Sequence, residues 1–233
     1  MASKDSLEIR ELLAKGTVIQ AGTNGSVAIR LRKIGTETAT SVTVTTATNI
    51  VLVGSVTTDT IAFATYTTYG AVVDAINATG RWEAKIIDAL RSKASASTLV
   101  DGAVTASADT NGLVIWDVKQ DTDASLQIAV CLTPARDFDA PKGHSVELRE
   151  LKYSVNMGTA AADSVQIWIR KGTVETQVFG ELSVDTTATT INFAGGEVGI
   201  TGGVDEEIVA LVKDAAALSD AAGNYVRVTG IVK

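Results

Sequence analysis

The chain has 233 residues, of which 45% are hydrophobic and 20% are charged, and its 27 acidic and 20 basic side chains give a net charge of −7. This length is sufficient for one large or two small domains with hydrophobic cores. A mean hydropathy of +0.21 argues against an intrinsically disordered chain. The acidic balance argues against nucleic-acid binding, because proteins that neutralise phosphates normally carry a basic patch.

Threonine and alanine dominate the composition, with 30 Thr and 33 Ala against 5% aromatic residues and a single histidine. β-branched threonine packs well on half-buried sheets, so the composition predicts a strand-rich protein with polar faces. The first residues lack the apolar stretch of a secretory signal, and no window approaches about 18 uninterrupted apolar residues. We therefore expect no membrane partner.

The first 25 residues are predicted to form a helical arm. Residues 5–8, Asp-Ser-Leu-Glu, have the form of a capping box, and Gly16 offers a stop. A helix of about eleven residues is marginal alone in water, so its apolar face must contact the rest of the protein or a partner. The side chains of this candidate contact are Leu7, Ile9, Leu12 and Leu13.

Residues 26–110 are predicted to form a small α+β unit. Hydrophobic residues alternate with polar ones over 27–34 and 41–45, which indicates strands with one polar face. The apolar run 49–53 fits a strand that is covered on both sides. Residues 68–77 predict a short helix with Thr68 as its N-cap, and 82–86 alternate again as a strand. Residues 87–93 fit helix and strand equally.

Residues 111–233 are predicted to be almost entirely β. Clusters of Gly, Asp and Asn separate short alternating segments, a pattern typical of a β-sandwich, of which the jelly roll is one form. The predicted strands are Leu113–Val118, Leu126–Leu132, Val146–Val155, Ser164–Arg170, Thr176–Val184, Thr190–Phe193, Glu207–Val212 and Tyr225–Val232.

The acidic clusters are the first place to look for chemistry, and each lies beside a turn, where acids are ordinarily solvated. Two of them have carboxylates at alternate positions, as some calcium loops do, but neither continues into the full loop pattern. No metal site, cofactor or catalytic residue is therefore predicted. The clusters are Asp117/Asp121/Asp123, Asp137/Asp139 and Asp205/Glu206/Glu207.

The single cysteine and the single histidine are also weak candidates. Cys131 lies in an apolar run and is interpreted as a buried strand residue rather than a nucleophile. His144 precedes a strand without a recognisable nucleophile motif around it. Neither residue predicts an enzyme.

The three tryptophans allow two interpretations. An exposed set could stack on sugar rings, whereas tryptophans among alternating aliphatic residues are more often core or interface anchors. The second interpretation is favoured for Trp82, Trp116 and Trp168, because Trp116 and Trp168 both lie among alternating aliphatic residues. Trp168 is the better candidate for exposure, and we include it among the candidate partner contacts.

Two segments resemble structural proteins of tailed bacteriophages. Residues 66–90 contain a Thr-rich hairpin, a short helix ending Val-Asp-Ala-Ile-Asn, a glycine and a strand with Trp-Glu-Ala. Residues 223–232, Gly-Asn-Tyr-Val-Arg-Val-Thr-Gly-Ile-Val, look like the last strand of a virion β-sandwich. The resemblance implies a virion protein without catalytic residues or cofactors.

The resulting hypothesis is a capsid decoration or cement protein. It would be made in the host cytoplasm and assemble on the phage head as a homo-oligomer, and the resemblance implies a closed ring, often a trimer. Its expected partners are the major capsid protein and copies of itself. The alternatives are a carbohydrate-binding or host-adhesion module and a tail or baseplate component.

Overall fold

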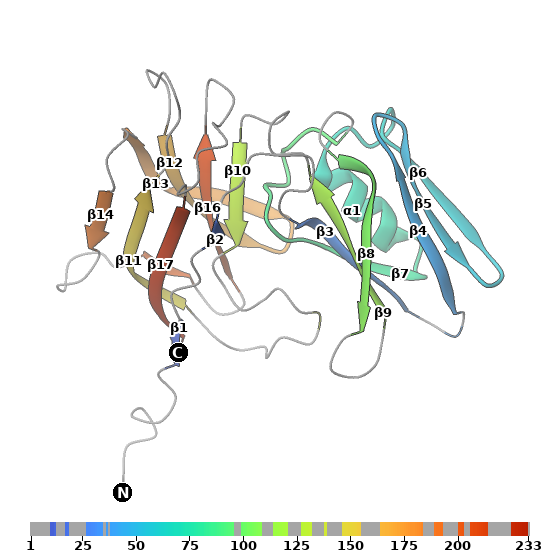
Figure 1. Ribbon diagram of the computed structural model, residues 1–233, viewed down its shortest axis with the longest axis horizontal. Coiled ribbons are helices and arrows are strands. Elements are labelled where there is room, and N and C mark those ends of the chain that lie inside the picture. Colours follow the sequence, from blue (N-terminus) through green and yellow to red (C-terminus); the bar gives the residue numbers. More distant parts are fainter. Residues whose placement is uncertain are drawn as a thin grey trace, which may run out of the picture. The chain divides into compact units, whose positions relative to one another are not determined.

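A computed structural model describes residues 10–12, 17–18, 27–34, 36, 38–95, 99–108, 114–120, 127–131, 138, 146–154, 164–183, 189–192, 200–202, 206–213 and 225–232. Over these residues the protein is mainly β, as predicted, with antiparallel sheets and one α-helix (Figure 1). The chain divides into two compact units, one of residues 21–128 and one of residues 1–20 with 129–233.

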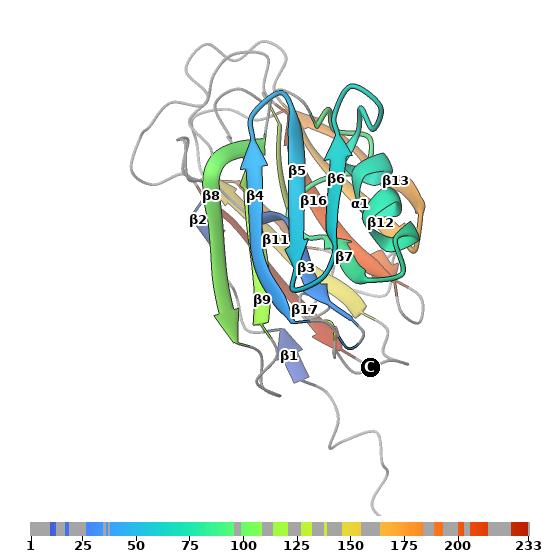
Figure 2. The ribbon, with the colours of Figure 1, turned by 90° about the vertical axis from the view of Figure 1, so that its right-hand side faces the viewer.

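The unit of residues 21–128 contains two antiparallel sheets and the helix α1 (Tyr69–Ala78). Figure 2 shows β4, β5 and β6 in a row, with β8 next to β4. The first sheet has the order β7 (Trp82–Ile86), β3 (Val27–Lys33), β9 (Val114–Gln120) and β8 (Leu99–Ala108), and the second has β4 (Ala39–Thr45), β5 (Asn49–Gly54) and β6 (Thr58–Ala62).

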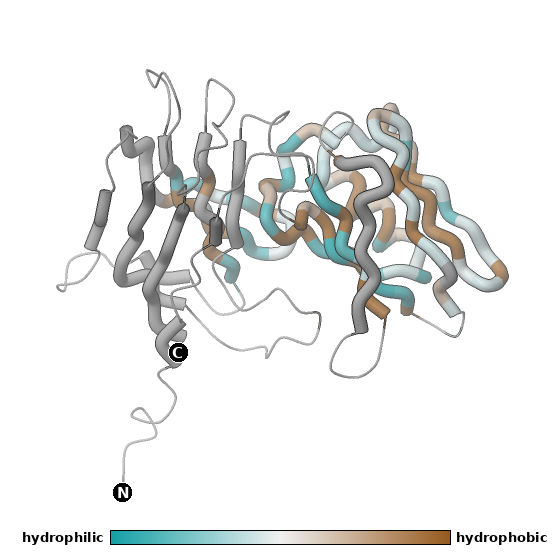
Figure 3. The backbone as a smooth tube through the Cα atoms, in the orientation of Figure 1, coloured by the Kyte–Doolittle hydropathy of each residue, from teal (hydrophilic) through white to brown (hydrophobic). Residues whose placement is uncertain are grey.

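One hydrophobic core joins both sheets and the helix. Along β5, Ile50 and Leu52 are buried while Val51 and Val53 are half-buried, because successive side chains of a strand point to opposite faces. Figure 3 shows hydrophobic stretches in this unit bordered by paler ones of intermediate hydropathy. The largest fully buried side chains are Trp82, Tyr69, Phe63, Ile29, Leu31, Ile50, Leu52, Ile76, Ile87 and Leu99.

The helix α1 confirms the capping prediction. Thr68 has an extended backbone and its side chain accepts a hydrogen bond from Ala71 N at 3.2 Å. The amides of Tyr69 and Gly70 donate to the carbonyls of Lys93 and Arg91, each at 2.8 Å. The first turn of the helix is therefore satisfied within the protein.

The second unit contains the other two sheets. One has the order β1 (Arg10–Leu12), β17 (Tyr225–Val232), β11 (Val146–Ser154) and β14 (Thr189–Asn192), with β15 (Ile200–Gly202) on β11 and β2 (Thr17–Val18) on β17. The other has the order β10 (Gln127–Cys131), β16 (Glu207–Lys213), β12 (Ser164–Lys171) and β13 (Val174–Ser183). Packing of the two as a sandwich stays a prediction.

Two sequence-based expectations differ from the structure. The predicted helical arm is wrong at Arg10–Leu12, which form β1 and pair with β17. A short apolar segment fits either state, and pairing supplies the backbone bonds that a marginal helix lacks. The expected boundary near residue 110 lies instead at 128/129, because β9 pairs with β3 and β8. Strands β8 and β15 were not expected.

Candidate interaction surface

The outward side of the β4–β5–β6 sheet, which we call the threonine face, carries no charged side chain among the residues that the structure describes. The register gives three rows across the strands, and the exposed residues in them are threonines on the outer strands. The rows are Ser41–Val53–Thr58, Thr43–Val51–Thr60 and Thr45–Asn49–Ala62. The valines of β5 lie half-buried between the threonines.

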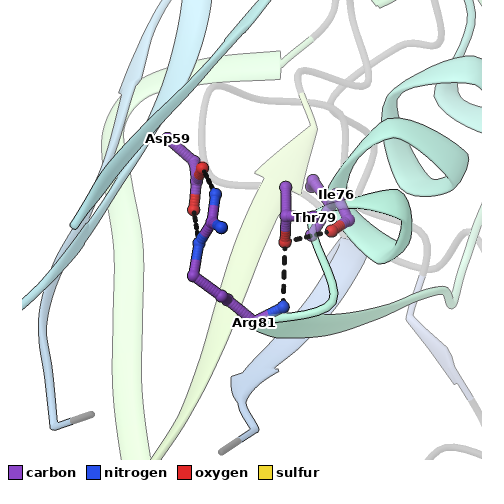
Figure 4. A network of polar contacts seen from close by, with 4 residues as sticks. All are labelled: Asp59, Ile76, Thr79 and Arg81. Carbon is purple, nitrogen blue, oxygen red and sulfur yellow. Dashed lines mark hydrogen bonds and ion pairs between the residues drawn. The ribbon is translucent and has the colours of Figure 1, made fainter.

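An ion pair fixes this sheet to the end of the helix (Figure 4). Asp59 alternates with the outward residues Thr58 and Thr60, so its side chain lies on the inner side, where it is 11% exposed. Both of its oxygens accept hydrogen bonds from Arg81, from Nε at 3.1 Å and from Nη2. The Arg81 amide in turn donates to Thr79 Oγ1, which donates to the Ile76 carbonyl.

Charged residues of the other sheet neutralise each other across strands. Arg30 on β3 donates from Nε and Nη2 to the carboxylate of Asp117 on β9, at 2.7 and 2.9 Å. Arg32 donates to Glu83 on β7 at 2.9 Å. Asp117 is thus engaged in a bidentate ion pair, the arrangement expected of a structural acid.

A buried polar cluster lies between the start of α1 and the end of β9. Lys93 Nζ donates to Gln120 Oε1 at 2.8 Å and lies 6.0 Å from the centre of the Tyr69 ring. The Tyr69 hydroxyl is 3.5 Å from the same oxygen, and Gln120 Nε2 donates to the Asp88 carbonyl. No motif in the sequence indicated this cluster, which ties the undecided segment 87–93 to the sheet.

The second unit holds a buried arginine between two acids. Arg170 on β12 is 4% exposed and is paired with Glu207 on β16 and, at 3.7 Å, with Glu175 on β13. Glu206 pairs with Lys171 at 3.5 Å. Of the acidic cluster at 205–207, Glu207 therefore links β16 to β12, and Glu206, just before β16, pairs with the end of β12.

The tryptophans confirm the structural interpretation where they are buried. Trp82 and Trp116 meet edge to face with ring centroids 5.7 Å apart. Trp168 on β12 is half-buried, and its Nε1 donates to Gln166 Oε1 at 3.0 Å. Its role as a partner contact stays a prediction.

The other expected contacts are described only in part. Leu12 lies in β1, although the structure does not describe its side chain, and Leu7, Ile9 and Leu13 lie outside the described residues. Cys131 ends β10, and its side chain is likewise not described. The remaining candidates outside the described residues are Asp121, Asp123, Asp137, Asp139, His144 and Asp205.

Within the described part of the chain, no group of three or more His, Cys, Asp or Glu side chains could hold a metal ion. The helix in that part is too short to span a membrane. Comparisons with protein-family models, curated proteins and solved structures found no match. We therefore take the threonine face as the candidate interaction surface of the described residues.

Proposed function

We propose that this chain is a structural virion protein that decorates or cements a bacteriophage head and assembles there as a homo-oligomer. The observation that carries the proposal is the threonine face, whose described residues carry no charge, on a chain with a net charge of −7. An uncharged face can be covered by another protein without the cost of desolvating charges. The acidic remainder of the chain keeps many free copies soluble.

The contacts that hold the sheet beneath this face support the proposal. Asp59 and Arg81 join the sheet to the helix end, and Thr46 Oγ1 joins the β4–β5 turn to the Leu99 carbonyl at 3.2 Å. β-branched side chains have few rotamers to lose on burial. A preformed surface loses little entropy on docking, which suits a protein that makes the same weak contact many times.

The proposed partners are the major capsid protein and further copies of this chain in a ring, for which a trimer is the expected number. The proposed location is the virion, and the proposal includes no nucleic acid, membrane, cofactor or catalytic activity. A carbohydrate-binding role draws less support, because sugar stacking needs exposed aromatic rings and Trp82 and Trp116 are 1% and 6% exposed. A tail or baseplate position is the alternative within the same class.

The experiment combines light scattering with binding to heads of the phage that encodes the chain. Wild-type protein is expected to form a defined oligomer and to occupy empty heads. Thr43→Lys places a charge in the middle row of the threonine face and is expected to lower occupancy at least about ten-fold. Thr173→Lys is the matched control, because Thr173 is exposed in the β12–β13 turn. Protein that is strictly monomeric and does not bind phage heads contradicts the proposal. Immunogold labelling of the tail instead of the head supports the tail or baseplate alternative.

A further inference from the structure

We propose that strand β6 is a self-association edge, at which two copies of this chain pair antiparallel across a two-fold axis through Thr60. The inference rests on the proposed function, because repeated contact between copies is what that function requires. It adds a specific contact between two copies. This contact is isologous, because both copies use the same strand, whereas the interface within a ring joins two different patches. On a shell, such a contact would join neighbouring rings.

The open side of β6 follows from the order of the sheet. β6 is the last strand of β4–β5–β6, and the opposite edge strand, β4, lies beside β8. No strand of the described residues pairs with the outer side of β6. An edge of this kind presents backbone donors and acceptors that another chain can use.

The register identifies which backbone groups point outward. At the two ends of the β5–β6 pair, Gly54 N donates to the Thr57 carbonyl at 2.7 Å and Phe63 N donates to the Thr48 carbonyl at 2.9 Å. In an antiparallel ladder, hydrogen-bonded pairs of residues alternate with non-hydrogen-bonded pairs. Asp59 and Ile61 therefore bond to β5, while Thr58 and Thr60 direct their backbone groups to the open side. Ala62 directs its amide there too, but its carbonyl accepts from Thr65 N and Tyr66 N.

Charge disfavours one register for pairing between two copies, and an axis through Thr60, the central residue of β6, lets the whole strand pair. An axis through Asp59 would place two carboxylates opposite each other, which is unfavourable. An axis through Thr60 places Thr60 opposite itself, Thr58 opposite Ala62 of the second copy and Asp59 opposite its Ile61. The Asp59 charge is already neutralised by Arg81 of its own chain. β6 contains no lysine or proline, the residues that commonly protect edge strands.

The same register extends the threonine face across the two-fold axis. The row Thr43–Val51–Thr60 then continues into the second copy, so the threonine face doubles in width.

A proline substitution tests the edge without removing a bond to β5. Thr60→Pro deletes an amide that points outward and is expected to raise the dissociation constant for self-association, measured by sedimentation, at least about ten-fold. Thr60→Val keeps the amide and the β-branched side chain, so it is expected to associate like wild type. Circular dichroism verifies that both variants fold. Unchanged association of folded Thr60→Pro overturns the inference.

Cross-linking provides a second measurement that does not depend on affinity. In a Cys131→Ala background, Thr60→Cys is expected to give a covalent dimer with a short bifunctional thiol reagent. Val51→Cys, one strand further in, is expected to give little. A stronger dimer from Val51→Cys means that the threonine faces stack on each other, and it overturns edge pairing.

The two proposals fail separately. Head binding by wild type with no effect of Thr60→Pro on association or cross-linking removes the edge and leaves the decoration function. Efficient cross-linking at Thr60 without any head binding supports the edge contact and removes the decoration function.

Discussion

The side-chain amide of Asn77 forms two hydrogen bonds with the backbone of Ala84: Nδ2 donates to the Ala84 carbonyl at 3.2 Å, and the Ala84 amide donates to Oδ1 at 2.7 Å. Asn77 is in the last turn of α1 and Ala84 is in the middle of β7. The side-chain amide of Asn77 thus forms with Ala84 the hydrogen bonds that a neighbouring strand would form. It fixes the helix end against the edge of the sheet.

Asn77→Ala should lower the free energy of unfolding by about 1–2 kcal/mol, because two backbone groups of Ala84 lose their partner. Asn77→Asp should also destabilise the protein, since a carboxylate can accept from the Ala84 amide but repels its carbonyl. Denaturant titration measures both values. Stability of Asn77→Asp equal to that of wild type would show that only the acceptor bond matters.

Gly70 lies in the first turn of α1, where its backbone approaches Arg91 closely. A Cβ at this position would lie 3.1 Å from the Arg91 carbonyl oxygen, which already accepts from Gly70 N at 2.8 Å. Alanine normally favours a helix by about 1 kcal/mol over glycine. Here we expect Gly70→Ala to destabilise the protein by about 1 kcal/mol, because the hydrogen-bonded backbone cannot move away without losing that bond.

Thermal unfolding of Gly70→Ala tests this expectation, with Ala71→Gly as the control for helix propensity. Ala71→Gly should lower the melting temperature through propensity alone. A higher melting temperature for Gly70→Ala than for wild type contradicts the close approach.

Much of the fold of residues 27–86 was predictable because each element carries a local signal. Alternation over 27–34 and 41–45 gave β3 and β4, and the hydroxyl of Thr68 marked the start of α1. The signal failed where pairing, rather than local pattern, decides the structure. Arg10–Leu12 have a helix-like sequence but pair with β17, more than two hundred residues later.

The threonine face was only partly predictable. Period-two alternation in 41–45 shows that Thr43 and Thr45 share a side, but the partners in each row depend on register, which the sequence does not reveal. The ion pair of Asp59 with Arg81 was equally hidden, because the two residues are brought together by the turn after α1. The ion pair of Asp117 with Arg30 was not predicted either, because acids beside turns are ordinarily solvated and the partner of Asp117 depends on the pairing of β9 with β3.

Trp82 carries a buried indole N–H that has no hydrogen-bond partner among the described residues, and its side chain is 1% exposed. Trp82→Phe deletes this group and most of the ring remains, so it should cost no more than about 2 kcal/mol. Trp82→Ala should cost about 3–5 kcal/mol through the cavity it leaves beside Trp116. Denaturant unfolding followed by circular dichroism gives both values. Equal losses for the two variants would mean that the indole nitrogen is satisfied in solution.

Arg170 holds two acids of neighbouring strands together in the second unit, and its loss should be costly there. Arg170→Met removes a charge that is 4% exposed and leaves Glu175 and Glu207 near each other without it, so we expect a loss of about 3–5 kcal/mol. Lys171→Met is the matched control, because Lys171 is the next residue and its side chain is 66% exposed in its pair with Glu206.

The control variant Lys171→Met should change the free energy of unfolding by less than about 0.5 kcal/mol, because exposed ion pairs contribute little to stability. Glu207→Gln should fall between the two, because Arg170 retains Glu175 at 3.7 Å. Urea unfolding followed by circular dichroism ranks the three variants. If Arg170→Met and Lys171→Met are equally stable, the buried triad does not hold β12, β13 and β16 together, and hydrophobic packing around Ile167 and Val209 does so alone.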